Sequence, residues 1–73
     1  MKKEINIIAE ELGINPTKHS KAIYLVHLFF DHNIERTCLW FRTKNPSLGE
    51  ISPLNMILLG RYKYLLKWVE SVI

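Results

Sequence analysis

The chain lacks the features that commonly hold very small domains together. It has 73 residues and a single cysteine, Cys38, so no disulfide can form within one chain. No Cys/His cluster with metal-ligand spacing is present, and we expect neither a structural metal nor a cofactor. A chain of this length buries only about 60% of its unfolded surface. Because 48% of the residues are hydrophobic, we expect tight helix packing and a homo-oligomer.

Long apolar segments are also absent. The longest run, from Ala22 to Phe30, is short and is broken by His27, so it is too short to span a membrane and we expect no membrane contact. Met1-Lys2-Lys3 is followed by Glu4 and Asn6 rather than by an apolar core and a small-residue cleavage site. This start does not resemble a signal peptide, and we expect a cytoplasmic protein.

The residues that could support catalysis are few and scattered. There is no phosphate-binding loop, no dinucleotide fingerprint and no pair of carboxylates in a polar cleft. His27 and Asp31 are one helical turn apart and could form a hydrogen bond, but no nucleophile accompanies them. His27 and His32 are five residues apart, which does not place them on one helical face, and His19 is isolated. Cys38 is expected to be a small buried hydrophobe. We therefore expect no enzyme.

Charge is distributed unevenly along the chain. The net charge is +3. Residues 1–35 hold four lysines and five acidic residues, a balance of −1, whereas residues 36–73 hold six basic and two acidic residues, a balance of +4. The basic half could be an ordinary solvated face, or it could meet an acidic partner or nucleic acid.

Apolar spacing predicts helices throughout. The expected ranges are 4–12, 16–32, 34–43, 53–59 and 61–72. Gly13 is a candidate C-cap, Asn15-Pro16 a candidate helix start, and Asn33 a candidate N-cap. The range 16–32 is apolar almost all the way round and is expected to be the central helix. No segment has the pattern of a strand, so the sequence predicts an all-α single domain of about five short helices.

The stretch from Trp40 to Pro53 is the one long segment that cannot be helical throughout. Each proline disfavours helical backbone at the residue before it, at Asn45 and at Ser52. Asn45-Pro46-Ser47 is a turn sequence, Gly49 can take positive φ, and Ser52-Pro53 is a helix start. Leu48 and Ile51 are apolar, so this loop is expected to pack against the core.

This spacing resembles the C-terminal toxin-binding domain of Xre/MbcA/ParS-type antitoxins. The resemblance covers residues 20–73, with residues 1–19 as an N-terminal helical extension. It implies that the family's structural signature corresponds to Trp40, Asn45, Pro46, Leu48, Gly49, Pro53 and Gly60. It also implies a partner toxin of the RES-domain class, which acts on NAD, and a last helix that docks near the toxin's active site.

The chain departs from that family in three places. Where the family has the second glycine of Leu-Gly-Gly, this chain has Glu50, for which positive φ is less favourable. Only about twenty residues precede the resembling region, fewer than the family's helix-turn-helix domain needs. The chain stops at Ile73, where family members often continue past the last helix.

The last helix carries the candidate partner-binding residues. Tyr64 and Trp68 are four apart and are expected to form an exposed aromatic pair with basic neighbours, which suits a protein interface. The alternative is that Trp68 widens the apolar stripe that faces the core. The candidate partner-binding set is Arg61, Lys63, Tyr64, Lys67, Trp68 and Ile73.

A second interpretation concerns the N-terminal region. Its order of helix, glycine turn and second helix is similar to that of a helix-turn-helix motif. In that case DNA would be contacted by Thr17, Lys18, Ser20 and Lys21. Against it, His19 occupies a position that usually holds a buried aliphatic residue, and Glu10 and Glu11 cancel the basic charge. A third interpretation is a self-associating adaptor of the same fold without a toxin.

Overall fold

A computed structural model describes residues 2–73, and over this range the protein is a small all-α single domain, as predicted. Five α-helices follow in order, with one short 3₁₀ helix, η1, between the third and the fourth. Their bounds are α1 Lys2–Leu12, α2 Ser20–Phe29, α3 Ile34–Arg42, η1 Pro46–Leu48, α4 Pro53–Leu58 and α5 Tyr62–Val72. No strand occurs within residues 2–73, and the only β-type contact there is an isolated bridge between Asn45 and Ile51.

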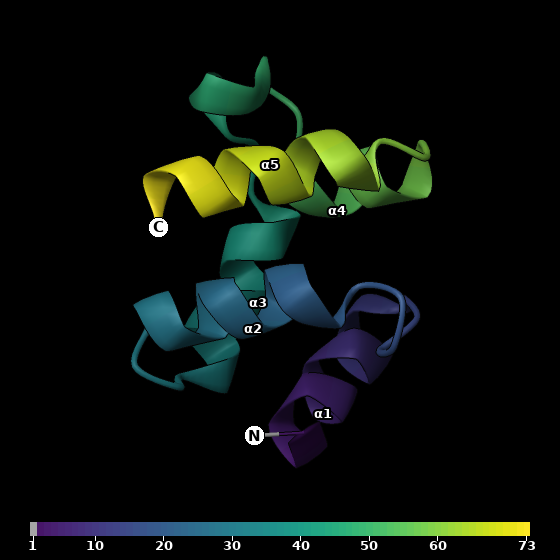
Figure 1. The fold of residues 1–73 in the computed structure, drawn as a ribbon, viewed down its shortest axis with the longest axis vertical. Coiled ribbons are helices and arrows are strands. Elements are labelled where there is room, and N and C mark those ends of the chain that lie inside the picture. The colour runs from purple at the N-terminus through teal and green to yellow at the C-terminus, as the bar shows by residue number, and fades with distance from the viewer. Residues whose placement is uncertain (1) are drawn as a thin grey trace.

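The helices pack around α3, which lies in the middle of the molecule (Figure 1). α1 and α2 contact each other and α3 on one side, while α4 packs on α3 from the other and α5 lies across α2 and α4. α1 and the N-terminus therefore lie toward one end of the long axis, and η1 lies at the opposite end, beyond α5. None of the helices formed by residues 2–73 is both long enough and apolar enough to cross a bilayer.

One hydrophobic core joins all five α-helices. The expected stripe of α1, Ile5, Ile8, Ala9 and Leu12, is buried, so residues before Ser20 belong to the same core as the rest of the chain. Its other buried members are Ile23, Val26, Cys38, Phe41, Met56, Ile57, Leu65 and Val69. Burying a large aliphatic or aromatic side chain stabilises the fold by about 1.5–3 kcal/mol. Cys38 has the buried, structural position that the sequence predicted.

Several helices begin or end at the capping residues that the sequence analysis predicted. Gly13 ends α1 with φ +71°. The Asn33 side chain accepts a hydrogen bond from the Arg36 amide at 3.0 Å and begins α3. The Ser52 hydroxyl accepts from the Asn55 amide at 3.2 Å and begins α4, and Gly60 with φ +78° follows it. These signals act within a few residues, so they are readable from sequence.

The predicted range of the second helix is wrong at both ends, since α2 spans only Ser20–Phe29. At the start, the Asn15 side chain accepts hydrogen bonds from the amides of Thr17 and Lys18, both at 2.9 Å, and closes a turn instead of opening the helix. At the end, Asp31 and His32 take left-handed φ values of +52° and +62°. Asp and His tolerate this conformation better than branched residues do.

α2 is also less enclosed than its composition suggested. Ala22, Ile23, Val26 and His27 are buried, but its last residue, Phe29, is 62% exposed. The apolar surface of α2 therefore extends beyond what the small core can cover.

The loop from Trp40 to Pro53 forms the predicted turn. The Asn45 side chain accepts a hydrogen bond from the Ser47 amide at 2.9 Å, and Gly49 takes φ +83°. Leu48 and Ile51 are partly buried against the core, as expected. Glu50 also adopts positive φ, +62°, despite its side chain. Left-handed backbone costs a residue with a Cβ roughly 1–2 kcal/mol, so the loop holds Glu50 in a strained conformation.

A polar network crosses the core at His27, which is fully buried. Its Nε2 lies 2.8 Å from Oε1 of Glu4 on α1, and its Nδ1 lies 2.9 Å from the Thr37 hydroxyl on α3. The Thr37 hydroxyl donates to the Asn33 carbonyl at 2.8 Å, so its oxygen accepts from His27. The expected partner of His27, Asp31, is not the one used, because the left-handed turn ends α2 before that residue.

Candidate functional site

α5 presents one face to the core and the other to solvent. Leu65 and Val69 are fully buried and hold the helix in place. On the outward side, Tyr64 is 73% exposed, and Lys63 and Lys67 are exposed on either side of it in the sequence. These residues therefore form an exposed surface on a helix that the core holds in position.

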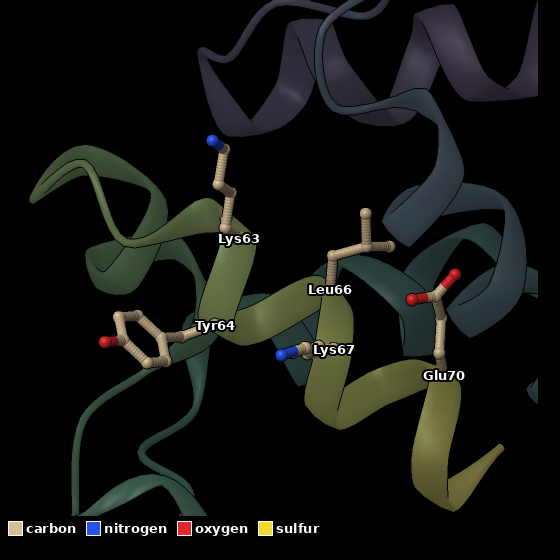
Figure 2. Close-up of a pocket in the computed structure, with 5 residues that line it drawn as sticks. All are labelled: Lys63, Tyr64, Leu66, Lys67 and Glu70. Carbon is tan, nitrogen blue, oxygen red and sulfur yellow. The ribbon is translucent and has the colours of Figure 1, made fainter.

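A groove runs beside α5, and Figure 2 shows the side chains that line it. This shallow groove of about 440 Å³ is lined by Lys63, Tyr64, Leu66, Lys67 and Glu70. Glu70 forms an ion pair with Lys21 of α2 at 2.8 Å, and this hydrogen bond raises the pKa of the lysine. Among residues 2–73, the positive charges along the groove that form no ion pair are consequently those of Lys63 and Lys67. We call this surface, from Lys63 to Glu70, the α5 groove.

Trp68 does not form the expected exposed pair with Tyr64. Its ring is partly buried and stacks on Trp40 of α3, with centroids 6.3 Å apart and planes inclined by 19°. The two rings line an apolar pocket of about 250 Å³ together with Val26, Phe29, Phe30, Val72 and Ile73. Trp68 and Ile73 therefore belong to a different surface from Tyr64, and the alternative, in which Trp68 extends the apolar side of α5, describes the ring better.

A third hollow lies at the start of α5. It measures about 410 Å³ and is lined by Lys18, His19, Ile57, Gly60, Arg61, Tyr62, Lys63 and Tyr64. The fold thus brings Lys18, a candidate DNA contact, beside Arg61 and Lys63, which were candidate partner contacts. Sequence reasoning missed this combination because the two segments are far apart in the chain.

The four candidate DNA contacts are not displayed along one exposed helix. Thr17 and Lys18 lie in the turn before α2, Ser20 is partly buried, and Lys21 is paired with Glu70. His19 is buried and its ring meets Tyr62 edge-on, with centroids 4.7 Å apart. This contact joins the N-cap residue of α2 to α5. His19 thus packs where a helix-turn-helix would have a buried aliphatic residue.

The one cysteine, Cys38, is buried in the core. Burial raises the pKa of the Cys38 thiol, which disfavours the nucleophilic thiolate. Within residues 2–73, no group of three or more His, Cys, Asp or Glu side chains could hold a metal ion.

The residues on which the sequence resemblance rests lie in the turn and in the contacts around it. Trp40 packs on Phe41 and Trp68, Asn45 and Pro46 begin η1, and Gly49 and Gly60 supply left-handed backbone. Pro53 is fully buried at the first position of α4. Comparisons of the chain with protein-family models, curated proteins and solved structures found no match.

Proposed function

We propose that this protein is a protein-binding module that neutralises a toxin, and that the α5 groove is its docking surface. The single observation that carries the proposal is Tyr64, which is 73% exposed on a helix anchored from behind by buried Leu65 and Val69. The resemblance to the antitoxin domain supplies the class of partner, a RES-type toxin directed at NAD.

The chemistry of the groove favours an acidic partner surface. Tyrosine is among the residues that contribute most to protein interfaces, because it covers a large area while losing little side-chain freedom. Lys63 and Lys67 line the same groove and carry positive charge that would accelerate association with an acidic patch. The anchored helix would need little rearrangement on binding, which lowers the entropic cost.

Co-purification from the native host tests this proposal. The tagged chain is expressed near its natural level and the protein that accompanies it in stoichiometric amount is identified. Tyr64→Ala should weaken that complex by at least about thirtyfold, the loss typical of a hot-spot residue. Tyr24→Ala, which alters another exposed tyrosine on α2, is the matched control and should leave the complex intact.

Neutralisation is then measured directly. Expression of the identified partner alone should stop growth and deplete NAD, and co-expression of this chain should restore both. The Tyr64→Ala variant should fail to restore them while retaining its helical circular dichroism. A variant that still neutralises, or a partner that is harmless alone, would refute the proposal.

A further inference from the structure

The hollow at the start of α5 gathers positive charge from two distant segments. Lys18 comes from the turn before α2, and Arg61 and Lys63 come from the beginning of α5. No acidic side chain of the described residues, 2–73, lines the hollow. None of these three cations forms an ion pair within residues 2–73. Their charges are thus uncompensated and close to one cavity.

The helix itself adds to this charge. α5 has 11 residues, and its N-cap residue, Arg61, provides no side-chain hydrogen bond. The amides of residues 62–64 make no hydrogen bond to any group of residues 2–73. Such free amides carry the positive end of the helix dipole and are ready donors to an anion.

A histidine that is almost completely buried, His19, lines the same hollow. His19 is only 8% exposed, and its Nδ1 makes no hydrogen bond within the described chain. Burial lowers the pKa of this histidine, and the nearby Asn15 backbone only partly opposes that effect. A bound anion would favour the charged ring.

We propose that this hollow is a phosphate-binding site formed by Lys18, His19, Arg61, Lys63 and the free amides that begin α5. A phosphate group carries close to two negative charges and several acceptor oxygens, which suits three cations and a helix N-terminus better than a single carboxylate does. Arginine can also bind two phosphate oxygens at once. The inference does not rest on the proposed function, because it needs no protein partner, although Lys63 and Tyr64 line both the hollow and the α5 groove.

Titration of the full chain with inorganic phosphate, followed by NMR, tests the site. The amide signals of residues 62–64 and the ring nitrogens of His19 should shift together and saturate. Lys18→Ala and Arg61→Ala should each raise Kd by about tenfold or more, the loss expected for one charge-assisted hydrogen bond. Both positions are exposed, so these variants should fold.

Lys44→Ala is the matched control because it removes the same charge from an exposed position outside the hollow. It should change Kd by no more than about twofold, through screened long-range charge alone. Equal effects of Lys18→Ala and Lys44→Ala would overturn the site. So would the absence of saturable shifts at residues 62–64.

Two further probes distinguish the sources of the phosphate. A nucleoside monophosphate that shifts the same signals and binds more tightly than inorganic phosphate would assign the site to a small ligand. A short DNA duplex that binds more tightly still, with an affinity that falls steeply as salt is added, would assign it to a nucleic-acid backbone. Duplex binding that is unaffected by Arg61→Ala would contradict the proposed site.

Discussion

Replacing Trp68 with alanine should destabilise the fold substantially, because the ring is part of the structure. Truncation of a buried tryptophan costs about 3–5 kcal/mol, and a stacked aromatic pair contributes about 0.5–1.5 kcal/mol of such a loss. Trp68 stacks on Trp40 but is only partly buried, so we expect about 2–3 kcal/mol. A domain of this size has roughly 4–11 kcal/mol of total stability. The loss would thus be a large fraction of it.

Urea unfolding followed by far-UV circular dichroism measures the effect. Thermal unfolding should show a decrease of about 10–20 °C for Trp68→Ala. Trp68→Phe should lose less, because a ring remains to stack on Trp40. Tyr64→Ala, on the outward side of the same helix, should change stability by no more than about 0.5 kcal/mol. If Trp68→Ala left the unfolding midpoint unchanged while abolishing partner binding, Trp68 would be an interface residue and the reasoning would fail.

Three shorter predictions concern strain, pH and association. Glu50→Gly should stabilise the protein by up to about 1 kcal/mol in urea unfolding, because glycine relieves the positive φ at some entropic cost; a destabilised variant would contradict the strain. The hydrogen bond from His27 lowers the pKa of Glu4 in the folded protein. The ionised Glu4 carboxylate therefore stabilises the fold above the ordinary glutamate pKa, and this stabilisation is lost as the pH falls through the lowered pKa of the folded state. Glu4→Gln should remove that part of the acid dependence, as measured by unfolding midpoints between neutral pH and pH about 3, and an unchanged slope would count against it. Exposed apolar side chains such as Phe29 and Leu39 should produce a dimer or larger species, and sedimentation equilibrium showing only the 8.6 kDa monomer at micromolar concentrations would rule this out.

Much of the fold was predictable because its signals are local. Asn33, Gly49 and Ser52 act on backbone groups within a few residues, and the turn and the helix starts follow from them. The start of α2 was not predictable in the same way. Asn15 was predicted to open the helix, but its side chain closes a separate turn, and His19 at the end of that turn packs on Tyr62 of α5.

The candidate site was predictable only in part for a similar reason. Helical spacing correctly predicted that Tyr64 is exposed beside the buried stripe of α5, since that inference needs only one helix. The position of Trp68 depends on Trp40, and the hollow at the start of α5 depends on Lys18 meeting Arg61. Both are contacts between helices, and periodicity within one helix carries no information about them.

The network at His27 fixes where α1 sits along its own axis. The apolar residues Ile5, Ile8 and Leu12 recur at helical spacing, so a core that recognised them by shape alone would tolerate a slide of one turn, about 5.4 Å. Such a slide would bring Ile8 toward the place of Glu4 and leave the buried His27 ring without its acceptor. This hydrogen bond, together with the one that Arg42 donates to the Glu11 carbonyl at 2.8 Å, therefore favours one register over others that hydrophobic packing would accept.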